Sequence, residues 1–223
     1  MAKGILIVGE SGTGKSTSAR NLDAASTFII NVQGKPLPFF NKDFVECERG
    51  KEPKKGNVYY TDKVMEIKNL LNYISSSRPE IKTIVIDDFQ YVAANMFMNR
   101  ITEKGFDKFN DIGFSIWVLP KLLPELRSDL NVFFFTHEES FITDEGYSKR
   151  RAKRMGKLID QQVGGIEGYF TYVLFTSVDK NDEGIHHSFI TNSDGETTAK
   201  TPIGMFDDLK IDNDLTLINN KLN

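Results

Sequence analysis

A glycine-rich turn between an apolar strand and a helix restricts the fold of this chain more than any other feature. Residues 4–8 (GILIV) are mostly apolar, and residues 9–16 (GESGTGKS) follow at once. The second stretch fits the pattern G-x-x-x-x-G-K-[ST], whose glycines let successive backbone N–H groups point at phosphate oxygens. A helix predicted over residues 14–22 adds a favourable potential for an anion. The stretch therefore predicts a phosphate-binding turn at the end of a buried strand.

Three residues at the end of this turn have specific expected roles in nucleotide binding. Lys15 is expected to reach the β- and γ-phosphates, the Ser16 hydroxyl to bind Mg²⁺ and Thr17 to lie near the α-phosphate. The alternative is a glycine-rich turn that binds nothing. The complete set expected to bind a nucleotide is Gly9, Glu10, Ser11, Gly12, Thr13, Gly14, Lys15, Ser16 and Thr17.

Strand and helix patterns alternate along the chain. Continuous apolar runs, typical of strands buried on both faces, lie at residues 26–32, 82–87 and 131–137. Helical patterns lie at residues 62–77, 92–105 and 111–129, the last of these with breaks expected at Pro120 or Pro124. This alternation predicts an α/β fold with a mostly parallel sheet flanked by helices. Residues 167–179 and a hairpin over 185–204, turning at 192–195, predict antiparallel strands at one edge.

The length of 223 residues fits a single domain, 1–223, with residues 43–62 as an insertion and 207–223 as a C-terminal tail. The single cysteine, Cys47, excludes a disulfide framework and a cysteine zinc site. The apolar run at residues 5–8 is too short for a signal peptide, and no run approaches a membrane span. We therefore expect a cytoplasmic protein that does not contact a membrane.

A second candidate site lies in TIVIDDF, residues 83–89. Its apolar strand delivers Asp87 to the carboxyl end, where ligands bind in open α/β sheets. Asp87 is expected to hold Mg²⁺ through water, and Asp88 to polarise an attacking water. The alternative for Asp88 is that its side chain caps the next helix.

A third candidate is VFFFTHEE, residues 132–139, in which a buried strand ends at Thr136 and His137. We expect His137 to sense the γ-phosphate by a hydrogen bond, and the alternative is a structural histidine. Glu138 and Glu139 are further candidates for orienting water.

The net charge is −3, but residues 148–157 (SKRRAKRMGK) contain six basic residues and no acid. Three readings stay open: a DNA-contacting loop, a finger inserted into a neighbouring subunit, or a solvated run of charge. The candidate DNA-binding residues are Lys149, Arg150, Arg151, Lys153, Arg154 and Lys157.

Together these stretches resemble small phage-encoded RecA-like P-loop ATPases, the AAA-domain nucleotide-binding proteins of phage recombination and replication modules. Relatives of that group act as single-strand annealing recombinases. The resemblance covers most of the chain, residues 3–210, and its more specific parts are residues 154–176 and 191–206. It implies a RecA-like core, ATP with Mg²⁺, slow or DNA-stimulated hydrolysis to ADP and phosphate, and a location in the host cytoplasm.

The resemblance also implies partners and a further catalytic residue. It implies a homo-oligomeric ring or filament with ATP between subunits, single-stranded DNA, and phage single-strand-binding or replication proteins. In Ala199-Lys200-Thr201-Pro202, Lys200 matches the lysine that RecA-like ATPases send to a neighbour's γ-phosphate, but proline stands in place of their arginine. RecA also carries a glutamate after its second strand, where NVQGKPLP has no acid. Lys15, Asp88, His137 and Lys200 are thus the expected catalytic residues.

Two other functions stay open. IDDFQ has some similarity to thymidine kinases, although one cysteine cannot supply their usual zinc site, so a P-loop kinase of nucleotides or other small molecules is one alternative. A nucleotide-gated DNA-binding or loader protein with little turnover is the other.

Overall fold

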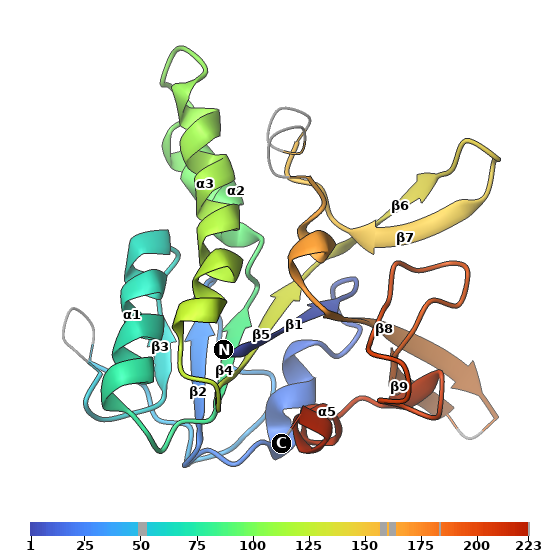
Figure 1. Ribbon diagram of the computed structural model, residues 1–223, viewed down its shortest axis with the longest axis horizontal. Helices are drawn as coiled ribbons and strands as arrows, with labels where there is room; N and C mark the ends of the chain where they lie inside the picture. Colours follow the sequence, from blue (N-terminus) through green and yellow to red (C-terminus); the bar gives the residue numbers. More distant parts are fainter. Residues whose placement is uncertain (49–52, 157–159, 161–163, 183, 223) are drawn as a thin grey trace.

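The structure is a computed structural model that describes residues 1–48, 53–156, 160, 164–182 and 184–222. Within these residues the main sheet has eight strands in the order β10-β9-β8-β1-β5-β4-β2-β3 (Figure 1). From β8 to β3 neighbouring strands are parallel, whereas β9 and β10 are antiparallel to their neighbours. The strands are β1 (Lys3–Val8), β2 (Thr27–Asn31), β3 (Val58–Tyr60), β4 (Thr83–Asp87), β5 (Asn131–Thr136), β8 (Tyr172–Asn181), β9 (Gly184–Ile190) and β10 (Lys210–Asp212).

Helices cover both faces of this sheet. Along β1, Leu6 and Val8 pack in one apolar cluster with α1, α2 and α3, while Ile5 and Ile7 pack in another with η1 and α5 (Figure 1). Successive side chains of a strand point to opposite faces, which is why an entirely apolar strand needs both covers. The helices are η1 (Ser16–Asn21), α1 (Val64–Ser77), α2 (Tyr91–Asn99), α3 (Asp107–Leu122), η2 (Leu123–Glu125), η3 (Ile166–Tyr169) and α5 (Leu215–Leu222).

The predicted fold class is confirmed: the chain is a mixed α/β protein with a mostly parallel sheet flanked by helices and antiparallel strands at one edge. Within the predicted insertion 43–62, Val58–Tyr60 forms β3, the outermost parallel strand. The insertion and the tail 207–223 stay predictions. No helix among the described residues is long and apolar enough to cross a membrane.

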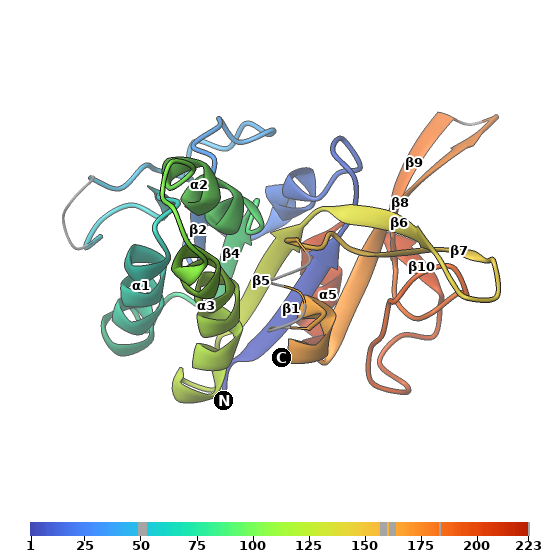
Figure 2. The same cartoon turned by 90° about the horizontal axis from the view of Figure 1, so that it is seen from above.

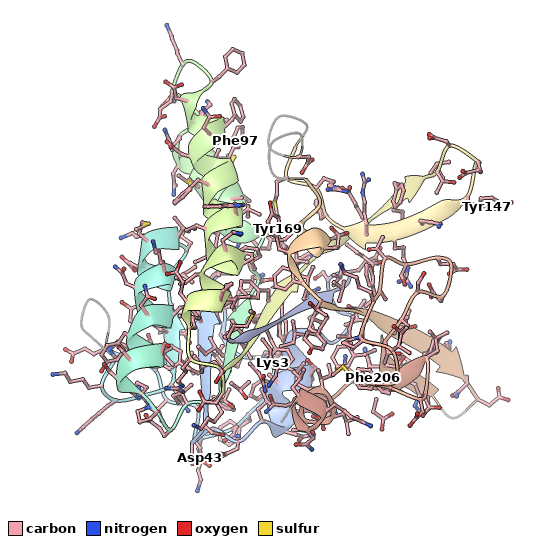
Figure 3. The ribbon with its side chains drawn as sticks, in the orientation of Figure 1. Lys3, Asp43, Phe97, Tyr147, Tyr169 and Phe206 are labelled. Atoms are coloured by element: carbon pink, nitrogen blue, oxygen red, sulfur yellow. The ribbon has the colours of Figure 1, made fainter. Side chains whose placement is uncertain are left out.

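A separate antiparallel hairpin, β6 (Glu138–Ile142) with β7 (Ser148–Ala152), continues directly from β5. It projects away from the main sheet in Figure 1, and in the view from above it overlaps β8 and β9 (Figure 2). Tyr147 lies at its tip (Figure 3), with an exposed side chain. We call β6 and β7 the basic hairpin.

The structure differs from three local expectations. The hairpin expected to turn at 192–195 is instead formed by β8 and β9, with Asn181 paired to Gly184. Gly184 has φ +129°, which a residue with a side chain rarely adopts, and this fixes the turn there. At 192–195 the Asp194 carboxylate accepts hydrogen bonds from the backbone N–H groups of Glu196 and Thr197, a local turn that needs no strand pairing.

The other two concern helices. The helix expected over residues 14–22 is a 3₁₀ helix, η1, over Ser16–Asn21. The helix expected to break at Pro120 or Pro124 runs through Pro120, and its α-helical part ends at Leu122, just before η2 and Pro124. Pro120 lacks the N–H that would bond to the carbonyl oxygen four residues earlier, and α3 ends within one turn after it.

Candidate nucleotide-binding site

The site forms where β1, β5, β4 and β2 end at one edge of the sheet. Because β5 lies between β1 and β4, Val8 pairs with Thr136 and Ile86 pairs with Phe134. On the far side of β4, Asp87 pairs with Asn31 at the end of β2. Parallel pairing therefore brings the glycine-rich turn, the 137–139 segment and the two aspartates to the same edge.

The glycine-rich turn holds its lysine inward. Lys15 is 6% exposed, and its Nζ donates to the carbonyl oxygens of Gly9 and Glu10, each at 2.7 Å. Burial lowers the pKa of Lys15, and the nearby carboxylates of Asp88 and Asp87 offset part of that shift. Phosphate oxygens are stronger acceptors for an ammonium than two neutral carbonyls, so the turn is set to exchange these contacts for an anion.

Two glycines of the turn are required by its geometry. A Cβ on Gly9 would lie 1.7 Å from Oγ1 of Thr176 on β8, a clash with a buried side chain. Gly14 has φ +94°, and a Cβ there would lie 2.9 Å from Oδ1 of Asn213. A side-chain hydrogen bond of 2.6 Å between Thr13 and Thr176 ties the turn to β8.

Ser16 and Asp87 meet beneath the turn. The Ser16 hydroxyl donates to Oδ1 of Asp87 at 2.8 Å. Burial raises the pKa of Asp87 to about 6, although the hydrogen bond from Ser16 acts in the opposite direction. A hydroxyl beside a buried carboxylate is a hard oxygen pair suited to Mg²⁺, which keeps several waters and takes its other ligands from phosphates. Accordingly, the described residues contain no cluster of three or more acidic, histidine or cysteine ligands.

Asp88 has a strained backbone and two cationic or hydrogen-bonding neighbours. Its φ of +61° is the one positive value among the described non-glycine residues. The Lys35 Nζ lies 3.2 Å from its Oδ2, and the His137 Nε2 lies 3.6 Å from its Oδ1. Burial acts to raise the pKa of Asp88, but His137 and Lys35 outweigh it and the pKa is lowered. The helix-capping alternative is not supported, because α2 begins at Tyr91 without a side-chain cap.

His137 is fixed from two sides. Its backbone N–H donates to Oε1 of Gln90 at 2.7 Å, and its ring lies edge-on to Tyr91 with centroids 5.8 Å apart. Of the two glutamates that follow, Glu138 has a side chain only 6% exposed, and its burial raises its pKa. Glu139 instead pairs with Arg151 on the basic hairpin, 2.9 Å away.

Nine predicted residues line one cavity of about 300 Å³: Ser11, Gly12, Gly14, Lys15, Ser16, Thr17, Asp87, Asp88 and His137. Its walls also include Lys35 and Tyr91, which were not predicted from the sequence. We call this cavity the phosphate pocket. The signal for Lys35 was its place just after β2, the strand that pairs with β4.

A second cavity, of about 550 Å³, adjoins the phosphate pocket and shares Gly12, Gly14 and Thr17 with it. Its other walls come from Arg20 on η1, from β9, and from the segment that runs from the end of β10 to the start of α5, and none of these residues was predicted from the sequence. His187 Nδ1 lies 3.2 Å from the Thr13 carbonyl oxygen, and Arg20 donates to the Asn213 carbonyl oxygen at 2.7 Å.

Two predicted groups lie apart from the phosphate pocket. Lys200 is exposed, and its backbone pairs with Val173 on β8 rather than lining the pocket. The basic segment is not a loop, because Ser148–Ala152 forms β7. Lys157 lies outside the described residues.

The hairpin register also supplies the acids that the basic segment lacks. Glu138 pairs with Ala152 and Glu139 with Arg151 across the strands, so acids and bases share one small sheet. Arg150 lies 3.5 Å from Glu138, and the Arg151 guanidinium lies 4.4 Å from the centroid of the Phe141 ring. Residues 148–152 are therefore a paired strand rather than the loop expected there, and the acids that pair with it come from β6. Lys149 is on the same strand, while Lys153 and Arg154 follow it toward an apolar pocket beside His137.

No protein-family model matches the sequence, and no curated protein is significantly similar to it. Among solved structures, the chain is similar to a KaiC-like protein of the hyperthermophilic archaeon Pyrococcus horikoshii OT3. The two are 13% identical over 89% of this chain and 82% of the other, with a TM-score of 0.45. A likeness of this degree transfers no activity, so the function must be inferred from the geometry of the site.

Proposed function

We propose that the chain binds ATP with Mg²⁺ in the phosphate pocket and hydrolyses it to ADP and phosphate. The observation that carries this proposal is the convergence of the glycine-rich turn with Asp87 and Asp88 on one cavity. These groups are 71 or more residues apart in the sequence, as the Ser16 to Asp87 hydrogen bond illustrates. Catalysis of phosphoryl transfer depends almost entirely on positioning and on electrostatic stabilisation, and this cavity has groups for both.

In this proposal Lys15 binds the phosphates, and Ser16 and Asp87 bind the metal ion. Lys15 places a buried positive charge against the β- and γ-phosphates. Ser16 and Asp87 would hold Mg²⁺, and the fit rests on the part-buried Ser16 hydroxyl beside the buried Asp87 carboxylate. Bound Mg²⁺ would neutralise developing charge on the phosphate oxygens.

Asp88 and His137 face the expected position of the γ-phosphate. In the proposed mechanism Asp88 orients the attacking water and accepts its proton. His137 sits 3.6 Å from Asp88 and holds the carboxylate in place, with its own position set by Gln90. The 550 Å³ cavity beside the turn has room for the nucleoside.

The biological setting follows from the resemblance to phage ATPases. We infer that ATP binding controls action on single-stranded DNA in recombination, annealing or replication, within a homo-oligomer whose sites lie between subunits. Lys200 is the candidate residue that crosses to the neighbour, since it is exposed and lies outside its own phosphate pocket. Phage single-strand-binding or replication proteins are the proposed partners, and the host cytoplasm is the proposed location.

Phosphate release from ATP is the direct test, measured with and without Mg²⁺ and single-stranded DNA. Mg²⁺-dependent release that DNA accelerates supports the proposal. Transfer of the γ-phosphate to a nucleoside monophosphate or another small molecule would establish the kinase alternative instead. Failure of the wild-type protein to bind ATP would overturn every nucleotide-based function.

A mixing experiment tests the shared site. Lys15→Ala and Lys200→Ala proteins are each expected to be inactive as pure oligomers. If Lys200 acts on the neighbour, mixed oligomers regain part of the wild-type activity, because some interfaces combine an intact turn with an intact Lys200. No recovery in a verified mixed oligomer contradicts the assignment.

One observation favours the alternative of a nucleotide-gated binding protein with little turnover. Lys35 follows β2, the position where RecA carries its glutamate, and it pairs with Asp88. ATP-dependent DNA binding without phosphate release would identify this function.

A further inference from the structure

Lys35 is placed at the phosphate pocket by a rigid turn. The side-chain amide of Asn31, at the end of β2, donates to the Lys35 carbonyl oxygen at 2.6 Å. Its oxygen accepts from the Gly34 backbone N–H at 2.8 Å. Gly34 has φ +66°, and Pro36 fixes its own φ at the next position. Asn31 itself is 3% exposed, so the turn is anchored in the core.

The ammonium group of Lys35 faces the pocket. Its Nζ lies 3.2 Å from Oδ2 of Asp88 and 5.6 Å from the centroid of the Tyr91 ring. Both of these partners also line the phosphate pocket. Lys35 therefore adds a second lysine to the cavity, from the segment that follows β2.

The contact with Asp88 is weak enough to be exchanged. The Lys35 side chain is 64% exposed and that of Asp88 is 16% exposed, so solvent reaches the ammonium and screens this ion pair. A bound nucleoside triphosphate presents more negative charge than one carboxylate, so it competes for the ammonium with a larger Coulomb attraction. The flexible four-carbon stem lets the charge move without moving the turn.

The geometry points to Lys35 as a second phosphate-binding lysine that releases Asp88 when a nucleoside triphosphate binds. In this scheme, which rests on the proposed function, Lys35 neutralises Asp88 in the empty pocket. When the γ-phosphate arrives, the ammonium moves to its oxygens, and the Asp88 carboxylate is free to hold the attacking water. No bond forms or breaks in this exchange.

The test compares ATP and ADP binding, both with Mg²⁺, in Lys35→Met, Lys35→Arg and the control Lys42→Met. Lys42 is an exposed lysine in the same connection between β2 and β3. We expect Lys35→Met to weaken ATP binding about tenfold and ADP binding less than twofold, as the loss of one charged contact to the γ-phosphate. The Lys35→Arg protein should keep most of the wild-type preference for ATP over ADP. The Lys42→Met protein should bind both nucleotides with wild-type affinity.

A structural role for Lys35 would give a different result. Equal weakening of ATP and ADP, or no change in either, overturns the inference while leaving the ATPase proposal intact. Equal thermal unfolding midpoints of Lys35→Met and wild type would exclude a folding defect as the cause. If wild-type protein binds neither nucleotide, both the proposed function and this inference fail, and the wild-type titration alone reveals it.

Discussion

Two charged regions, the phosphate pocket and the basic hairpin, follow from neighbouring strand ends of the sheet. They differ in how far their charges are paired with opposite charges. In the phosphate pocket, Lys15 is buried against neutral carbonyls, and the buried Asp87 carboxylate accepts a hydrogen bond from the Ser16 hydroxyl. On the basic hairpin, Arg150 and Arg151 each face a glutamate across the strands. Buried charges that lack full compensation cost stability and are kept where a ligand completes them. Compensated charges at a surface are commonly structural.

Charged residues of the sequence therefore fall into two groups, those that line a candidate site and those that are paired within a surface hairpin. The single lysine of the glycine-rich turn lines a cavity, whereas two arginines of the basic segment pair with glutamates of the same hairpin. Substitutions in the two regions should have effects of different size and kind.

The largest effect is expected from Lys15→Ala. Loss of the buried ammonium should weaken Mg²⁺–ATP binding by about 100-fold or more, since charged contacts in such pockets are worth several kcal/mol. Titration with a fluorescent ATP analogue measures the loss. Lys42→Ala, at an exposed position, is the matched control, and wild-type affinity in Lys15→Ala would contradict the role of the pocket.

A smaller and metal-dependent effect is expected from Asp87→Asn. Amide oxygen is a weaker Mg²⁺ ligand than carboxylate, so ATP affinity should fall about tenfold when Mg²⁺ is present. With EDTA in place of Mg²⁺, the variant and wild type should bind equally. Because the substitution removes a buried charge, the metal-free variant should unfold at the same temperature or higher. Equal losses with and without metal would show that Asp87 acts in some other way.

The basic hairpin should respond in the opposite direction when its acids are removed. Glu139→Gln removes the ion-pair partner of Arg151, so the affinity for single-stranded DNA should rise a few-fold. The slope of log K against log salt concentration should become steeper by up to about 0.7. Binding to a labelled oligonucleotide across a salt series measures both. Asp144→Asn, in the turn between β6 and β7, serves as a control for charge alone. If both variants gain equally, net charge rather than pairing is responsible.

The smallest effect concerns the backbone of Asp88. Its φ of +61° strains any residue with a Cβ, so Asp88→Gly should be more stable than Asp88→Ala by about 1 kcal/mol. Chemical unfolding of both variants without nucleotide measures this difference. Equal stabilities would show that the strain is relieved elsewhere in the loop. Both variants remove the carboxylate, so neither should hydrolyse ATP at the wild-type rate.

Parts of the site were predictable because they depend on short stretches of sequence. The glycine-rich turn is a local structure, set by residues that are within eight positions of each other. Asp87 was found because an entirely apolar strand ends in an acid, and strand ends of parallel sheets gather at one edge. His137 was found by the same reasoning on β5.

Other parts depended on pairing between distant segments. Lys35 reaches Asp88 because β2 lies next to β4, a neighbour relation that no local pattern specifies. The cavity beside the turn is closed by β9, β10 and α5, and the expected turn at 192–195 had placed that hairpin wrongly. The sequence also overstated the unpaired positive charge of the basic segment. The glutamates that pair with Arg150 and Arg151 lie 12 positions away along the chain.

The sequence by itself determined the glycine-rich turn, the alternation of buried strands and helices, and the acids at the strand ends. These follow from local backbone geometry and from the burial of apolar residues, which short patterns encode. Only the tertiary structure decided which charges stand alone and which are neutralised. Coulomb interactions depend on distance in space, and the register of paired strands sets that distance.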